Sequence, residues 1–145
     1  MQTPLSYPRT RHDPAPLTDL SVRDERARLS PSALRAFFNT MERWSVRDQD
    51  ARKLLGGVAS STFYEYKKDP ERLLDQDKLT RISYLIGIFK DLHILHDERL
   101  ADRWVQLPNR NRIFGGGTPL DYMIKGGAPA MQIVRRLLDA RRGGL

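Results

Sequence analysis

Apolar residues recur at helical spacing, i, i+3, i+4 and i+7, in every apolar segment of the chain, and period-two alternation is absent. Ser30-Pro31 places a capping residue before a proline and predicts that a first helix begins there. The pair Ser45 and Asp48 has the spacing of a capping box and predicts a second helix that ends at Gly56-Gly57. Hydroxyl side chains at 60–62 predict a third, short helix. The sequence therefore predicts an all-α fold.

The longest apolar segment runs from about Asp75 to His96 and predicts a long central helix. Its apolar residues cover more than one face, so this helix is either the centre of the domain or a dimer seam. A further helix is predicted between a cap at Asp97 and the break at Pro108. We assign residues 75–107 to central dimerisation helices.

The last part of the chain predicts two short helices separated by glycines. Thr118 can cap a helix that begins with Pro119 and ends at Gly126-Gly127. The final helix carries one predicted apolar stripe, made of Ala130, Ile133, Val134, Leu137 and Leu138.

The runs FGGGTPLDYMIKGG (114–127) and VRRLLDARRGG (134–144) together resemble the toxin-binding domain of Xre/ParS-type antitoxins, the family that pairs with RES-domain toxins. The glycine run, the Pro-Leu-Asp triplet, the second glycine pair and the arginine-rich helix occur in this order, and the resemblance extends over residues 30–145. It implies a helical, dimeric antitoxin that holds an NAD-degrading toxin inactive and represses its own operon.

Three short helices before a long one are also typical of a helix-turn-helix DNA-binding module, which we place at residues 30–74. Gly57, Val58 and Phe63 have the spacing of the turn glycine and the two buried anchors of such modules. Lys53 stands where a small residue is usual, and Gly56-Gly57 indicates a turn lengthened by one residue. A plain helical bundle with a solvated lysine-bearing helix is the competing interpretation, and the resemblance to the Xre family favours DNA binding.

The predicted third helix supplies most of the candidate DNA contacts. Hydroxyl, phenol and carboxyl groups can read base edges, whereas lysine and arginine bind phosphates. The candidates are Ser60, Ser61, Thr62, Tyr64 and Glu65 for bases, and Arg52, Lys67 and Lys68 for phosphates.

The final helix and its tip supply the candidate toxin contacts. We expect residues 113–138 mainly to form a docking platform and residues 139–145 mainly to inhibit, with the tip reaching into the NAD-binding pocket that the family resemblance implies for the toxin. The predicted toxin-binding residues are Tyr122, Arg135, Arg136, Asp139, Arg141, Arg142, Gly143, Gly144 and Leu145.

The net charge of +7 is concentrated in two parts of the chain. Residues 30–68 hold 7 basic and 4 acidic side chains and residues 106–145 hold 7 and 2, whereas residues 69–105 hold 6 and 8. Two basic surfaces suggest two partners, operator DNA and the toxin, although ordinary solubilising charge explains the total equally well. Residues 1–29, which are rich in proline, predict an extended or disordered arm.

Several kinds of chemistry are not expected. There is no cysteine, and hence no disulfide or thiolate metal site. No apolar run is long enough to cross a membrane. We therefore expect a soluble, cytoplasmic protein that joins the nucleoid when it is bound to DNA. His93 and His96 have a metal-compatible spacing but lack a third ligand, and Gly115–Gly117 lacks the Lys-Ser/Thr of a P-loop. We predict no catalytic residue, metal or cofactor.

Two other functions remain open from the residues. One is a stand-alone dimeric transcriptional repressor whose C-terminus binds another protein or only itself. The other is a chromosome-segregation adaptor of the ParS type, which would bind DNA away from its own promoter. A RES-type reading frame beside the gene would favour the antitoxin.

Overall fold

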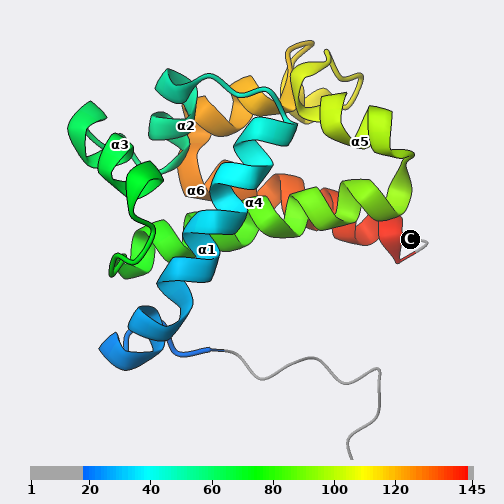
Figure 1. The fold of residues 1–145 in the computed structure, drawn as a ribbon. Coiled ribbons are helices and arrows are strands. Elements are labelled where there is room, and N and C mark those ends of the chain that lie inside the picture. The colour runs from blue at the N-terminus through cyan, green and yellow to red at the C-terminus, as the bar shows by residue number, and fades with distance from the viewer. Residues whose placement is uncertain (1–17, 144–145) are drawn as a thin grey trace, which may run out of the picture.

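The computed structural model describes residues 18–143, and this part of the chain folds into six α-helices and two short 3-10 helices with no strand (Figure 1). The prediction of an all-α fold is confirmed. The elements are α1 (Arg23–Arg43), α2 (Asp48–Leu54), α3 (Ser60–Lys68), α4 (Gln76–Leu95), α5 (Glu98–Arg103), η1 (Trp104–Gln106), η2 (Arg112–Phe114) and α6 (Pro119–Arg142).

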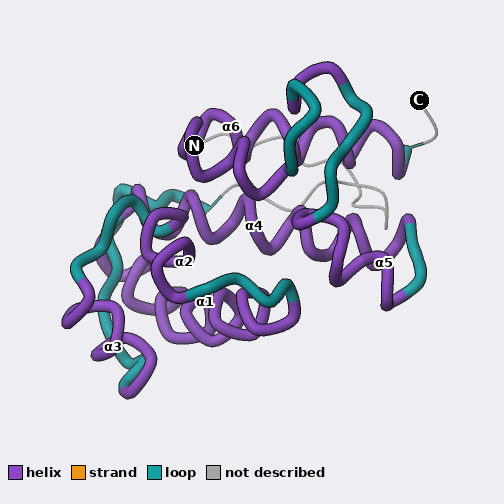
Figure 2. Tube along the Cα trace, turned by 90° about the horizontal axis from the view of Figure 1, so that it is seen from above, coloured by secondary structure: helices purple, strands orange, loops and turns teal. Residues whose placement is uncertain are grey.

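Helix α4 is the centre of the fold. Helix α1 crosses it on one side, and α6 runs along the opposite side (Figures 1 and 2). Its buried apolar residues are Leu79, Ile82, Leu85, Ile88 and Leu92. The apolar residues of this helix could have formed either the centre of the domain or a dimer seam. The structure supports the centre of the domain, because these side chains are covered within one chain. A homodimer would have to form through other residues.

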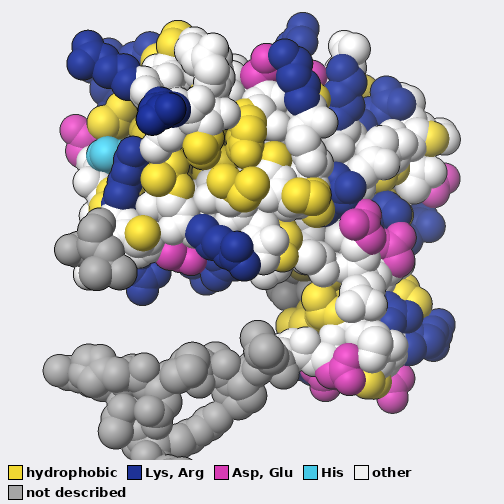
Figure 3. All heavy atoms as spheres, turned by 180° about the vertical axis from the view of Figure 1, so that it is seen from behind, with side chains coloured by type: hydrophobic (Ala, Val, Ile, Leu, Met, Phe, Trp, Pro, Cys, Tyr) yellow, Lys and Arg dark blue, Asp and Glu magenta, His cyan; other side chains and the backbone are white. Residues whose placement is uncertain are grey.

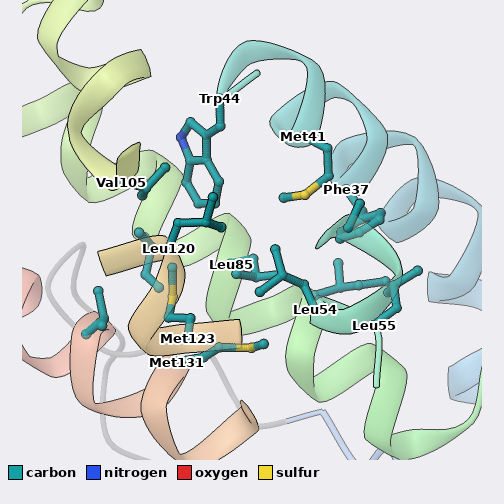
Figure 4. Packing of buried hydrophobic residues seen from close by; sticks show 14 of the residues in the cluster. Phe37, Met41, Trp44, Leu54, Leu55, Leu85, Val105, Leu120, Met123 and Met131 are labelled. Carbon is teal, nitrogen blue, oxygen red and sulfur yellow. The ribbon is translucent and has the colours of Figure 1, made fainter. Parts of the chain in front are cut away.

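One continuous core joins the N-terminal and C-terminal helices. The side chains that meet in it are Phe37, Met41 and Trp44 of α1, Leu54 and Leu55 at the end of α2, Leu85 of α4, Val105 of η1, and Leu120, Met123 and Met131 of α6 (Figure 4). Burial of this kind stabilises a fold by roughly 1.5–3 kcal/mol for each large apolar side chain. The two ends of the chain are therefore one cooperative structure.

Helix α1 begins at Arg23, seven residues before the start predicted at Ser30. The arm predicted for residues 1–29 is therefore wrong for 23–29, and residues 1–17 lie outside the described part. The Ser30 hydroxyl does not cap a helix: it donates to the carbonyl of Arg26 (2.6 Å) and accepts from the N–H of Leu74 (3.0 Å). Pro31 is tolerated inside the helix because its missing N–H would have bonded the carbonyl of Ala27, an exposed residue that water can reach.

The caps predicted at Asp97 and Thr118 are confirmed, and Asp75, which was not predicted as a cap, caps α4 in the same way. The side chains of Asp75, Asp97 and Thr118 accept hydrogen bonds from the backbone N–H groups at the starts of α4, α5 and α6, at 2.8, 2.9 and 3.1 Å. Each cap lies within three residues of the N–H that it bonds, so a local sequence pattern is sufficient to specify it.

The hydroxyl caps predicted for α2 and α3 are wrong. Ser45 lies in the left-handed region (φ 56°), and Arg47 precedes α2 without a side-chain cap. Ala59, rather than a hydroxyl residue, is the N-cap of α3. The segment before α2 is instead held from a distance, since the side-chain amide of Gln106 donates to the carbonyls of Trp44 and Ser45, each at 2.9 Å.

Helix α6 bends at Gly127, whose backbone is non-helical (φ 66°, ψ −151°), so it consists of the two predicted helical halves. The single apolar stripe predicted for its second half is wrong. Ala130, Val134 and Leu138 are buried, but Ile133 is 43% exposed and Leu137 is half-buried. Helix α6 packs on α4 through one ridge of residues spaced i, i+4, and the neighbouring ridge remains open.

We predict that Ser30→Ala lowers the free energy of unfolding by roughly 1–3 kcal/mol, because the buried N–H of Leu74 loses its acceptor. Urea denaturation of the two proteins measures the difference. Ser32→Ala is the matched control: Ser32 is exposed and bonds only the carbonyl of Leu29, so a change of less than about 0.5 kcal/mol is expected. Equal losses in both variants would contradict the bridging role of Ser30.

Candidate functional site

Helices α2 and α3 form a helix-turn-helix whose connection, residues 55–59, is longer than the usual turn of three or four residues. Gly56 (φ 100°) and Gly57 (φ 85°) both require the left-handed region that glycine adopts without strain. Arg52 closes this turn: its carbonyl accepts from the N–H groups of Gly57 and Val58, and its Nε donates to the carbonyl of Val58 at 2.8 Å. Arg52, which was predicted to bind phosphate, therefore has a structural role in the turn.

Two buried residues hold the turn and α3 on the body of the protein. Val58 is 8% exposed and Phe63 is 1% exposed, which confirms the predicted anchors. The Phe63 ring packs edge-on against that of Phe38 in α1, with centroids 5.4 Å apart. Of the two tyrosines in α3, Tyr66 is half-buried and Tyr64 is 53% exposed. The outer face of α3 is therefore free to contact a partner.

Lys67 lies one helical turn after Phe63 on α3, and its side chain is 42% exposed. Its Nζ forms an ion pair with Asp48 Oδ1 (2.8 Å) and lies 5.4 Å from the centre of the Phe63 ring. The Tyr64 hydroxyl donates to the other oxygen of Asp48 (3.3 Å). This group borders a hollow of about 240 Å³ whose lining is Phe38, Met41, Glu42, Val46, Asp48, Phe63 and Lys67. Lys67 is thus already paired within the chain.

The other predicted DNA contacts share the exposed side of α3. Ser60, Ser61, Tyr64, Glu65 and Lys68 are exposed, and Thr62 is half-buried. Glu65 has a partner, Arg72, at 3.7 Å. Within residues 18–143 no carboxylate pairs with Lys68, nor with the exposed Lys53 of α2. These two lysines are the cations of this module that are free to bind phosphate.

Two of the predicted toxin-binding residues, Arg135 and Arg142, hold α6 on α4. Arg135 donates from Nη1 to the carbonyl of Ser83 (3.3 Å), and its Nε lies 3.8 Å from Asp139. The guanidinium covers Gly87 so closely that a Cβ there would lie 2.5 Å from Nε. Arg142 Nη1 donates to Asp91 Oδ1 at 3.1 Å. Arg135, Asp139 and Arg142 therefore have internal roles that their sequence positions did not reveal.

Asp91 is a carboxylate buried in α4, with a side chain that is 2% exposed. Burial and the neighbouring carboxylate of Asp139 raise the pKa of Asp91 to about 6, although Arg142 favours the charged form. Its second oxygen, Oδ2, has no hydrogen-bond partner within the described residues. Sequence reasoning missed this residue; the available signal was an aspartate between Ile88 and Leu92 in an otherwise apolar stripe.

An apolar stripe that is only partly covered runs along the outside of the second half of α6, and of its members Leu137 also packs against the core. Pro129 and Ile133 are exposed, and Leu137 and Ala140 continue the same side as half-buried residues. Figure 3 shows this side of the molecule, where apolar side chains gather in the middle of the face and lysines and arginines surround them. Arg136 and Arg141 are exposed, and no ion pair engages either of them within residues 18–143.

Two further predicted toxin contacts within the described residues, Tyr122 and Gly143, lie near the two ends of α6. Tyr122 is half-buried, packs edge-on against Phe114 at 5.3 Å, and borders an open hollow of about 300 Å³ beside the glycine run. Gly143 is exposed, whereas Gly144 and Leu145 lie outside the described residues.

His93, the histidine of α4, bonds within α4 and contacts α5. His93 Nδ1 donates to the carbonyl of Phe89 (2.8 Å), and Nε2 lies 3.1 Å from Asp102. In the described part of the chain, no three His, Cys, Asp or Glu side chains are grouped as metal ligands, and no helix is long and apolar enough to cross a membrane.

Comparison with known proteins divides the chain into two matched regions. Residues 23–87 match the antitoxin Xre-like helix-turn-helix domain, and residues 88–144 match the antitoxin Xre/MbcA/ParS C-terminal toxin-binding domain. A protein of Sinorhizobium fredii (strain NBRC 101917 / NGR234), "Uncharacterized protein y4oB", is 38% identical over 130 residues, which is 89% of this chain and 98% of that protein. No solved structure matches the chain. The two matched regions meet inside α4.

We predict that Lys68→Ala weakens DNA binding more than Lys67→Ala does. Both variants lose one positive charge, but Lys67 is paired with Asp48 and Lys68 is free. The slope of log K against log salt concentration is negative, and loss of one phosphate contact should make it less steep by about 0.9. Titration of a promoter duplex with each variant at several salt concentrations measures this. An equal or larger loss for Lys67→Ala would contradict the assignment.

We also predict that Asp91 gives the protein a pH-dependent stability. Because the folded-state pKa of about 6 lies above the ordinary value of 3.8, the folded protein holds the proton more tightly. The resulting stabilisation is complete at low pH and is lost as the pH rises through 6. The unfolding free energy of the wild type minus that of Asp91→Asn should therefore fall, by at most about 3 kcal/mol, between pH 4 and pH 7. Urea denaturation across this range checks the sign, and a difference that stays constant would refute it.

Proposed function

The chain belongs to the Xre/ParS-type antitoxins, with a helix-turn-helix DNA-binding domain and a toxin-binding domain, and we propose that it neutralises a RES-domain, NAD-degrading toxin and represses its own operon. The protein acts in this proposal by binding rather than by catalysis. The observation that carries it is the open apolar stripe of α6, with Ile133 exposed beside unpaired arginines, inside the region matched by the toxin-binding domain.

The toxin docks, in this proposal, on the outer side of α6. Ile133 and Leu137 supply the apolar contact, and Arg136 supplies charge at its edge. The surface of the toxin that fits is apolar with carboxylates around it, because unpaired guanidinium groups bind carboxylates through paired hydrogen bonds. Because Arg142 is paired with Asp91, it is not part of the proposed docking surface.

Arg141 and the residues that follow it form the inhibitory tip. Arg141, at the end of α6, pairs with no carboxylate of residues 18–143, and it lies next to an Arg142 that is fixed to α4. Anchoring Arg142 holds the last turn of α6 on the protein, so that the tip extends from a fixed base. We propose that this tip occupies the NAD-binding pocket of the toxin.

The operator is read, in this proposal, by the outer side of α3 in a homodimer. Two copies of α3 would enter the major groove at half-sites about one helical turn apart. The residues available for bases are Ser60, Ser61, Tyr64 and Glu65, and Lys53 and Lys68 are available for phosphates. Because the apolar stripe of α4 is buried within one chain, the dimer would form through apolar residues that are exposed elsewhere.

Co-expression with the product of the reading frame beside the gene tests the antitoxin function. Ile133→Asp places a charge on the stripe and should weaken toxin binding at least about thirtyfold, the cost of losing a central interface residue. Growth and cellular NAD then fall. Leu73→Asp is the matched control, because Leu73 is also 43% exposed but lies outside the toxin-binding domain. Protection by the Ile133→Asp variant would refute docking on this stripe.

Removal of residues 143–145 combined with Arg141→Ala keeps the Arg142–Asp91 pair and so separates the tip from the platform in the same assay. We expect the truncated protein to bind DNA and to copurify with the toxin, but to leave NAD unprotected. Continued protection of NAD would refute the role of the tip. DNA binding by the intact chain without any effect on the toxin would support the stand-alone repressor instead.

A further inference from the structure

Tyr64 of α3 is an exposed aromatic side chain that the protein holds in place at two points. It is 53% exposed, and α3 lies at the edge of the molecule beyond α2 (Figure 1). Its ring packs edge-on against that of the buried Phe63, with centroids 5.9 Å apart. Its hydroxyl reaches α2, where it lies 3.3 Å from Asp48 Oδ2. The phenol is therefore open to a partner while its ring and its hydroxyl are both fixed.

Asp48, the first residue of α2, binds two side chains of α3. Its Oδ1 lies 2.8 Å from Lys67 Nζ, and its Oδ2 accepts from the Tyr64 hydroxyl. The Lys67 ammonium also lies 6.0 Å from the centre of the Tyr64 ring. We call these three residues, Asp48, Tyr64 and Lys67, the Asp48 cluster. The cluster connects the start of α2 to α3 and determines how the phenol lies on the surface.

The Asp48 cluster leaves the Tyr64 oxygen with one kind of hydrogen bond to offer. A phenol has one proton and two lone pairs, whereas an ionised carboxylate can only accept. Asp48 is the carboxylate of an ion pair, so the phenol proton points toward its Oδ2. A lone pair is what remains free on the Tyr64 oxygen. Toward an outside partner, Tyr64 is thus an acceptor and not a donor.

An acceptor in the major groove of DNA distinguishes the two bases of a pair. The donors there are the amino groups of adenine and cytosine, whereas the keto oxygens of guanine and thymine are acceptors. An acceptor of fixed orientation bonds the amino group and is repelled by a keto oxygen in the same place. A hydroxyl that is free to rotate would bond either group and would not discriminate between them.

We propose that Tyr64 reads the amino group of an adenine or a cytosine, and that Asp48 is the positioning residue that makes Tyr64 an acceptor. Asp48 does not touch the base in this assignment, because it acts by holding the phenol proton. The assignment rests on DNA binding by the outer side of α3, and it adds the class of base that this helix recognises. Guanine and thymine are rejected at the same place on the contacted strand.

Base analogues that lack a single amino group test the assignment. The full-length protein first selects its preferred sequence from a pool of randomised duplexes, so the test does not depend on a known operator. Each adenine of the selected sequence is then replaced in turn by purine deoxyriboside, and each cytosine by the deoxyriboside of pyrimidin-2-one. Each replacement removes the amino group and keeps the ring. The affinities of the wild type, Tyr64→Phe, Asp48→Asn and Asp50→Asn are measured for every duplex.

We expect at least one position at which loss of the amino group weakens wild-type binding about fivefold, the effect of one neutral hydrogen bond. Tyr64→Phe should lose this effect, because phenylalanine retains the ring that packs on Phe63 but has no oxygen. Any weakening of the base pair by the analogue acts on all four proteins alike and cancels when they are compared.

Asp48→Asn separates positioning from a purely structural role. Asparagine has the size of aspartate but can donate as well as accept, so the phenol can turn its proton toward the DNA. This variant should bind the selected duplex and lose the fivefold effect of the amino group. Asp50→Asn is the matched control, since it removes the same charge from the first turn of α2, where Asp50 pairs with Arg47 at 3.3 Å. It should retain the effect.

The outcomes separate this assignment from the DNA-binding function. Binding of the wild type to a selected duplex with no position that needs an amino group would overturn the assignment and leave DNA binding intact. An effect of the amino group that persists in Tyr64→Phe or in Asp48→Asn would also overturn it. Failure of the wild type to select any sequence would refute both the assignment and operator recognition by α3.

Discussion

The structure depends on the burial of one helix, α4, on several sides at once. Leu79, Ile82, Leu85, Ile88 and Leu92 are all at most 4% exposed, and they are covered by α1 on one side and α6 on the other. Burial of apolar side chains is the main favourable contribution to the folding free energy. This protein has no cysteine, so no disulfide adds to it. Because α1 belongs to the DNA-binding part and α6 to the toxin-binding part, neither part has a complete core without α4.

Sharing one helix also determines which charges are free for partners. The C-terminal region has seven basic side chains in the sequence, but packing against α4 engages Arg135 with Ser83 and Arg142 with Asp91. In the N-terminal part, Arg52 closes the turn and Lys67 pairs with Asp48. The surfaces left for partners are therefore smaller than the total charge suggests, and they consist of a few exposed cations beside uncharged or apolar groups.

The sequence predicted the features whose causes are local. The caps at Asp97 and Thr118 and the bend after Gly126 each depend on residues within a few positions of one another. The errors have distant causes: Ser30 is bonded to Leu74, and the chain at Ser45 is held by Gln106. For the candidate sites, the sequence placed the exposed residues of α3 on one helix. It could not show that Arg142 is fixed by Asp91 or that Ile133 faces outward, because both depend on how α6 lies on α4.

A core shared in this way limits how the two functions can be separated by mutation. A substitution of a residue such as Leu85 or Met131 removes packing from α4 and α6 together, and a buried leucine replaced by alanine costs roughly 2–5 kcal/mol, a large part of the stability of a small protein. Its effect on either function would therefore report unfolding. Only exposed positions, such as Lys68 on α3 and Ile133 on α6, affect one surface while leaving the common core intact.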